Sequence, residues 1–342
     1  MADFAFTRQD ETTVASEATK VVPLTCVGHS RPITHLSFSD GISTPGQQEQ
    51  YYLLSACKDN YPMLRDGITG DWIGTFIGHK GAVWNARLSL DAAMAATGSA
   101  DFTAKVWDTH SGAALASLEH NHIVRVVAFP PKAQPDTVAT GGMEKKLRIW
   151  DLAKAGEKES QSYEVGAGQH GGAIKGLVWT RDANVVVTAA DDKRMRWWDL
   201  RQQSCIASHD LDANPGSCEL NGGLDEQKDG EIITVAAGKS IYFFDGGRPG
   251  TLTKKIETAG EVASAALNGS ARRVVTGSPG DTWVRIWDFD SGQEVEMGRG
   301  HHGPIWTVAF SPDGKLYGTG SEDGTVKLWK FTRGPYGLWT YR

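Results

Sequence analysis

Histidine–aspartate pairs recur along the chain at one spacing. Three histidines each precede an aspartate by the same 22 residues: His79 and Asp101, His170 and Asp192, His301 and Asp323. A histidine beside a carboxylate can act as a general base or help to bind a metal ion. Several identical dyads have no evident use in one enzyme, so their regular repetition favours structural hydrogen bonds. The tandem His301–His302 lacks a third ligand at metal-site spacing, and we predict a structural role for it too.

These histidines belong to a longer internal repeat. In the same three copies a tryptophan follows the aspartate by six residues: Trp107, Trp198 and Trp329. A short phrase around the tryptophan, or around a substitute for it, closes seven copies at positions 66, 108, 151, 199, 245, 288 and 330. Successive copies are thus 42 to 48 residues apart. This period, with Gly-His and Trp-Asp markers, is typical of WD40 repeats, each of which folds as four strands.

Seven copies predict an all-β fold, a seven-bladed WD40 β-propeller. The histidine, the turn aspartate, a strand hydroxyl and the tryptophan of a blade can form a buried hydrogen-bonded set, with Thr97 or Ser99 as the hydroxyl in the second copy. The last copy has only three strands, so we expect residues 21–26 to add its outer strand and close the ring. We expect a flexible extension at 1–20, the propeller at 21–331 and a tail at 332–342 that packs on the rim. Three polar inserts, at 39–50, 154–168 and 212–230, interrupt the blades.

Composition narrows the function class. The 342 residues include 40 glycines and 12 tryptophans, as expected for many turns and packed aromatic side chains. A net charge of −6 disfavours a whole-surface grip on nucleic acid. The four cysteines show no C-x-x-C spacing, and no apolar run is long enough to span a membrane, so we expect free thiols in a soluble intracellular protein. We find no phosphate-binding glycine loop and no G-x-S-x-G motif, so the sequence predicts neither an enzyme nor a cofactor.

Function should then depend on surface loops. Loops that share one face of the ring in the third and fourth copies carry six basic residues: Arg125, Lys145, Lys146, Lys175, Lys193 and Arg194. They could form a patch for an acidic or phosphorylated segment, or they could be independently solvated. Trp84 and Trp306 hold matching positions at the start of the first strand in the second and seventh copies, near the same face. They could anchor a partner or pack between blades.

Phrases beyond the WD40 consensus resemble one family, the serine-threonine kinase receptor-associated (unr-interacting) proteins. The residues that carry the resemblance are Pro23-Leu24-Thr25-Cys26, Gly28-His29-Ser30-Arg31-Pro32, Ser55-Ala56-Cys57-Lys58-Asp59, Gly70-Asp71-Trp72-Ile73-Gly74-Thr75-Phe76, Gly78-His79-Lys80-Gly81-Ala82-Val83-Trp84, Ala100-Asp101-Phe102-Thr103-Ala104-Lys105-Val106-Trp107-Asp108, 311–329 and Tyr336-Gly337-Leu338-Trp339. The resemblance is strongest in the first, second and seventh copies.

The resemblance implies a non-catalytic adaptor that is cytoplasmic and nuclear. Its implied partners are Gemin-type subunits of the survival-of-motor-neuron complex, which assembles spliceosomal small nuclear ribonucleoproteins, and also receptor kinases and an RNA-binding translation regulator. We expect a monomeric propeller without membrane contact, with RNA bound indirectly. Two alternatives stay open: a component like the WD40 subunit i of translation initiation factor three, and a propeller that binds RNA directly.

Overall fold

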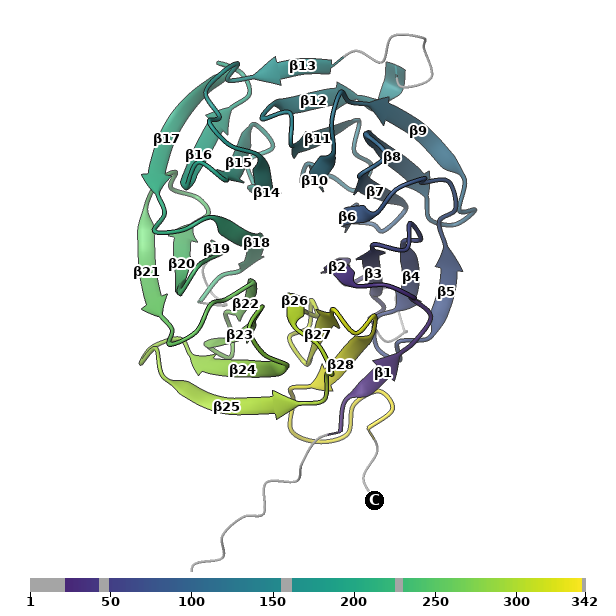
Figure 1. Cartoon of the computed structure of the whole chain (residues 1–342), viewed down its shortest axis with the longest axis vertical. Coiled ribbons are helices and arrows are strands. Elements are labelled where there is room, and N and C mark those ends of the chain that lie inside the picture. The colour runs from purple at the N-terminus through teal and green to yellow at the C-terminus, as the bar shows by residue number, and fades with distance from the viewer. Residues whose placement is uncertain (1–21, 43–48, 155–161, 225–229, 340–342) are drawn as a thin grey trace, which may run out of the picture.

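The chain forms a ring of seven antiparallel sheets with four strands each, which confirms the predicted propeller (Figure 1). The computed structural model describes residues 22–42, 49–154, 162–224 and 230–339. The first four blades, from inner to outer strand, are β2 (Ile33–Phe38), β3 (Tyr52–Cys57), β4 (Met63–Asp66) and β5 (Trp72–Thr75); β6 (Val83–Leu88), β7 (Met94–Ser99), β8 (Thr103–Asp108) and β9 (Ala114–Glu119); β10 (Val124–Ala128), β11 (Thr137–Gly142), β12 (Leu147–Asp151) and β13 (Ser162–Val165); β14 (Ile174–Trp179), β15 (Val185–Ala190), β16 (Arg194–Asp199) and β17 (Ser204–Asp210).

The remaining blades continue in the same order, and a single 3-10 turn, η1 (Leu152–Lys154), follows β12. They are β18 (Pro215–Gly222), β19 (Glu231–Ala237), β20 (Ser240–Asp245) and β21 (Leu252–Glu257); β22 (Ser264–Asn268), β23 (Arg273–Gly277), β24 (Trp283–Asp288) and β25 (Glu294–Arg299); β26 (Ile305–Phe310), β27 (Leu316–Ser321), β28 (Val326–Lys330) and β1 (Leu24–Cys26). No helix of the described segments is long and apolar enough to cross a membrane.

The N-terminal strand closes the ring as predicted. β1 pairs antiparallel with β28, with Leu24 opposite Leu328 and Cys26 opposite Val326. Arg65, which stands where five other blades have tryptophan, is buried and donates to the carbonyls of Gly70 and Val27. Arg65 therefore joins blade one to the chain just after the closing strand. Arginine in place of tryptophan thus stabilises the ring closure.

The core lies between blades, because each sheet packs both of its faces on neighbours. All six residues of β15 are buried, and they read as the nearly continuous apolar run that such a strand needs. Between blades four and five, Trp197 and Phe244 meet edge to face at 5.3 Å within one apolar cluster. Large side chains of this kind each contribute about 2 kcal/mol on burial.

Polar side chains on the inner strands tie neighbouring blades together around the central channel. Thr307 Oγ1 accepts the backbone N–H of Leu36 at 3.0 Å, and Asn85 Oδ1 accepts that of Val127 at 3.1 Å. The Ser264 hydroxyl accepts a backbone N–H of the next blade in the same way. These contacts fix the relative position of the inner strands, and thereby of the residues that line the channel.

Two of the predicted inserts contain blade strands. The segment predicted as an insert at 212–230 holds β18, the inner strand of blade five, and the one at 154–168 holds β13, the outer strand of blade three. β18 reads Pro-Gly-Ser-Cys-Glu-Leu-Asn-Gly, which is too polar and glycine-rich for a recognisable strand pattern. In the insert at 39–50, Ile42 and Gln50 form a β-bridge.

The C-terminal segment contacts blade one and the chain ahead of β1. The Tyr336 hydroxyl lies 3.0 Å from that of Tyr51, and it also donates to Asp313. The Trp339 indole donates to the carbonyl of Val22 at 2.9 Å. The predicted extension at 1–20 lies outside the described residues.

Candidate partner-binding cavity

The repeated histidines lie in buried hydrogen-bond networks. In blade two, a proton on Nδ1 lets His79 donate to Asp101 at 2.8 Å, and Nε2 then accepts from the Thr97 hydroxyl at 2.7 Å. The Trp107 indole donates to the same Thr97 oxygen at 2.8 Å. The corresponding set in blade seven is made by His301, Asp323, Thr319 and Trp329, with distances of 2.8 to 3.0 Å. Each ring nitrogen is engaged within the blade, so these histidines tie the turn to the strands.

Blade four departs from this pattern. His170 Nε2 and the Trp198 indole both contact the Thr188 hydroxyl, but His170 Nδ1 has no partner in the described part of the chain. The Asp192 carboxylate binds Arg196 at 2.8 Å instead. Arg196 offers two charge-assisted donors, which outcompete one imidazole N–H. The expected pairing of His170 with Asp192 is therefore wrong, although both residues occupy the predicted positions.

Replacing Thr97 with valine should lower the free energy of unfolding by about 1 to 3 kcal/mol, because His79 and Trp107 would lose a buried partner without a change of shape. Urea unfolding followed by tryptophan fluorescence measures the change. Thr253→Val, on the exposed outer strand β21, is the matched control, and its change should stay below about 0.5 kcal/mol. An equal, small change in both variants would contradict a structural role for the set.

One set resembles a metal site by proximity. Ligand atoms of His29, Cys57 and Asp59 lie within 4.8 Å of one another. His29 already contacts Asp59 at 2.9 Å and Ser55 at 2.8 Å, while Cys57 donates to the carbonyl of Arg31. Burial raises the pKa of the Cys57 thiol to about 12, which disfavours a thiolate ligand. The cluster is the hydrogen-bond set of blade one.

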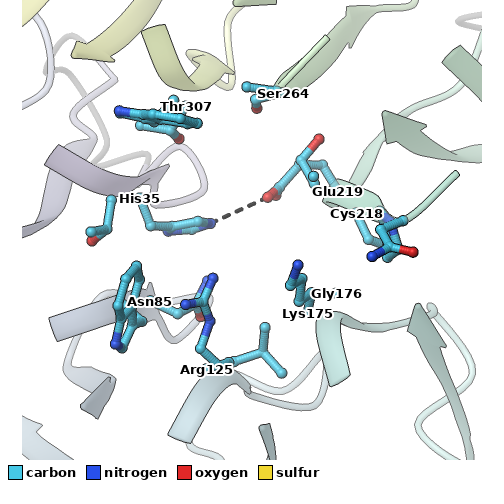
Figure 2. Close-up of a pocket in the computed structure, with 18 of the residues that line it drawn as sticks. His35, Asn85, Arg125, Lys175, Gly176, Cys218, Glu219, Ser264 and Thr307 are labelled. Atoms are coloured by element: carbon cyan, nitrogen blue, oxygen red, sulfur yellow. Dashed lines mark hydrogen bonds and ion pairs between the residues drawn. The ribbon is translucent and has the colours of Figure 1, made fainter. Parts of the chain in front are cut away.

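A cavity of about 520 Å³ occupies the end of the channel where the inner strands begin, and we call it the upper cavity. Four of the eight predicted surface residues line it: Trp84, Arg125, Lys175 and Trp306. Figure 2 shows Arg125 and Lys175 extending from neighbouring blades toward His35 and Glu219 on the other side. These four residues therefore meet at one end of the channel, and their role in binding a partner stays a prediction.

The other four predicted basic residues do not line the upper cavity. All four are exposed: Lys145, Lys146 and Lys193 lie in the turns between the second and third strands of blades three and four, and Arg194 is the first residue of β16. Lys146 pairs with Glu164 at 3.1 Å, and Arg194 pairs with Asp210 at 2.8 Å. Both acids stand on outer strands, and they reduce the positive potential there. The predicted six-residue patch is thus divided, and only its inner part faces a cavity.

The two matched tryptophans differ in what covers them. The guanidinium of Arg125 lies 3.8 Å from the ring centroid of Trp84, and the Lys58 ammonium lies 5.7 Å from it. Trp84 is consequently half-buried. Trp306 keeps 38 % of its surface exposed, and its indole donates to Glu322. The indole face of Trp306 is therefore open to a partner at the rim of the cavity.

A charged contact across the channel forms the floor of the upper cavity. His35 Nε2 donates to Glu219 Oε1 at 3.2 Å, and Arg87 Nη1 donates to Glu219 Oε2 at 2.7 Å. We call these three residues the cross-channel bridge, since they come from blades one, two and five. Arg87 and Glu219 also line a second cavity, of about 550 Å³, at the opposite end of the channel. The bridge therefore separates the two cavities.

The electrostatics of the bridge follow from burial and pairing. Burial by itself would raise the pKa of Glu219, but the Arg87 guanidinium and the hydrogen bond from His35 lower it to about 2. Burial lowers the pKa of His35, so that its imidazole is neutral near pH 7. Sequence reasoning missed all three residues. The available signal was a charged side chain within an inner strand, as in Val83-Trp84-Asn85-Ala86-Arg87-Leu88.

Comparisons with known proteins agree with the propeller fold and identify proteins of similar sequence. The family model "WD domain, G-beta repeat" matches residues 70–108, 163–199 and 292–330. Serine-threonine kinase receptor-associated protein from Bos taurus is 44 % identical over 323 residues, which cover 94 % of this chain and 86 % of the relative. The protein of the same name from Dictyostelium discoideum is 38 % identical over 312 residues, covering 90 % and 98 %. Eukaryotic translation initiation factor 3 subunit I from Drosophila sechellia is 28 % identical over 327 residues, covering 90 % and 96 %.

Proposed function

Because the chain belongs to the serine-threonine kinase receptor-associated protein family, we propose that it is a non-catalytic scaffold that holds partner proteins on the face around the upper cavity. The observation that carries this proposal is the contrast between the two matched tryptophans. Arg125 covers Trp84, whereas Trp306 stays open at the rim. Half-exposed tryptophans beside a concave site are frequent anchors of protein interfaces.

The partners we propose are Gemin-type subunits of a survival-of-motor-neuron-type complex that assembles spliceosomal small nuclear ribonucleoproteins. This work would take place in the cytoplasm and the nucleus, with RNA held through the protein partners. The name of the relatives states an association with serine-threonine kinase receptors, and a receptor of that class is a further partner that we propose. The more distant subunit I likeness supports the initiation-factor role less well.

Replacing Trp306 with alanine should reduce partner recovery about tenfold or more, because loss of a tryptophan anchor costs about 2 kcal/mol or more. The measurement is affinity purification of the tagged full chain from its own cells, with quantitative mass spectrometry. Sm proteins and Gemin-type subunits should be enriched with the unsubstituted chain. Thermal melting of both proteins verifies that the variant is folded.

Met297→Ala is the matched control, since Met297 is also 38 % exposed but lies on the outer strand β25. Recovery with this variant should stay unchanged. Enrichment of initiation factor three subunits in place of the Gemin-type proteins would overturn the proposed assembly role. Equal losses for both variants would show that the interface does not depend on the cavity rim.

A further inference from the structure

Arg125 holds a cationic group inside the upper cavity without a counter-ion in direct contact. Its guanidinium makes no hydrogen bond or ion pair with any residue that the structure describes, although Asp191 acts on it at longer range. The stack on Trp84 fixes the group in place. Arg125 is half-buried, and a ligand that supplies acceptors to a partly desolvated guanidinium would stabilise it.

The charges that line the cavity favour an anion. Its lining holds four cationic residues, Lys58, Arg87, Arg125 and Lys175, against two carboxylates, Glu219 and Glu261. Arg87 and Glu219 satisfy each other in the cross-channel bridge, and Lys175 lies 2.7 Å from Asp191. Lys58 and Arg125 remain without an ion pair among the described residues. A chain with a net charge of −6 thus gathers unpaired positive charge at one concave site.

The shape of the Arg125 guanidinium indicates which class of anion the upper cavity can bind. A guanidinium presents parallel N–H donors that match the two oxygens of a carboxylate or a phosphate. Holding that fork against Trp84 before binding reduces the entropy lost when a ligand arrives. The cavity volume of about 520 Å³ also falls in the usual range for ligand sites of about 300 to 1,000 Å³.

We propose that the upper cavity binds a carboxylate or phosphate group carried by an extended segment of a partner protein, with Arg125 as the forked donor and Lys58 and Lys175 as flanking cations. The protein-borne source rests on the proposed scaffold function, and it is favoured by Trp306, whose open indole on the same rim can pack an apolar residue of that segment. The cross-channel bridge limits how deep the segment can enter.

The anion-binding step can be tested without any partner. The purified full chain is titrated with inorganic phosphate and, separately, with glutarate at constant ionic strength, and the tryptophan indole N–H signals are followed by NMR. Trp84→Phe identifies the Trp84 signal. A saturable shift of this signal is expected for both anions, and Arg125→Gln should weaken both affinities at least tenfold. Arg194→Gln, which removes an exposed arginine paired with Asp210, should leave them unchanged.

Two outcomes would overturn the anion site: the absence of a saturable shift in the unsubstituted chain, and an affinity that Arg125→Gln does not change. The source of the anion is tested in the affinity purification. Arg125→Gln should lower partner recovery if the partner carries the anionic group. Loss of phosphate binding with full partner recovery would show that the site serves a free anion, which contradicts the protein-borne source but leaves the scaffold role intact.

Discussion

Replacing Glu219 with leucine should lower the free energy of unfolding by about 3 to 5 kcal/mol. Glu219 accepts from both Arg87 and His35 across the channel, and both partners are largely buried. Its removal leaves the mostly buried Arg87 guanidinium without a counter-charge, which is the costly way to break a buried ion pair. Equilibrium urea unfolding followed by tryptophan fluorescence measures the loss.

The double variant Arg87→Met with Glu219→Leu separates this cost from the value of the bridge itself. Removing both charges leaves no uncompensated ion, so the double variant should recover most of the stability lost by Glu219→Leu alone. Glu257→Leu provides the control, because Glu257 pairs with Lys255 on the surface and should matter by less than about 1 kcal/mol. If Glu219→Leu were no more harmful than this control, the bridge would have no role in stability.

The large scale of the fold could be predicted from the sequence because it repeats. Three blades carry histidine, acid and tryptophan markers at fixed spacing, and a phrase around the tryptophan or its substitute closes all seven copies, so seven segments indicate the same sheet. Ring closure by the segment 21–26 followed from counting strands in the last copy, and the paired strand is residues 24–26 of that segment. The strand β18 escaped detection because its sequence has neither alternation nor a run of β-branched residues. Because β18 was not predicted, Glu219 and the cross-channel bridge that it forms were not predicted either.

The candidate site could be predicted only in part, because residues that meet in it are far apart in the sequence. His35 and Glu219 are 184 residues apart and meet only because the ring brings blades one and five to a common channel. The sequence predicts the turns near which Lys146 and Arg194 lie, but not their ion pairs with the outer strands β13 and β17. Local sequence pattern therefore predicts the turn or strand in which a residue lies. How far its side chain lies from the ring axis, and which residue it pairs with, depend on the closed ring.

Acid should destabilise the propeller in two steps, and the first of them depends on buried histidines. Burial, together with Arg148 and Arg196, lowers the pKa of His120 and of His170, respectively, to about 4, although the nearby acids Glu144 and Asp192 partly oppose the shift. In the unfolded chain a histidine has a pKa of about 6.5. The folded state thus binds fewer protons between these values, so its stability is fully present above about pH 6.5 and is lost as the pH falls toward 4.

The expected loss between pH 7 and pH 5 is about 2 kcal/mol for each of these histidines. The second step lies lower, because Asp59, Asp323 and Glu219 have pKa values of about 2 in the folded state. Their contribution is present above about pH 4 and is lost as the pH falls toward 2. Urea unfolding at pH 7 and pH 5 isolates the histidine step from the carboxylate step.

A variant that cannot take up the proton tests the assignment. His170→Phe keeps a planar ring beside Trp198 but has no titrating group, so the difference in unfolding free energy between pH 7 and pH 5 should shrink by about 2 kcal/mol. The comparison uses this difference, and a general destabilisation by the substitution therefore cancels. His302→Gln, at an exposed site, should leave the difference unchanged. An unaltered difference in His170→Phe would show that His170 is not part of the histidine step, because a group with equal pKa values in both states cannot make stability depend on pH.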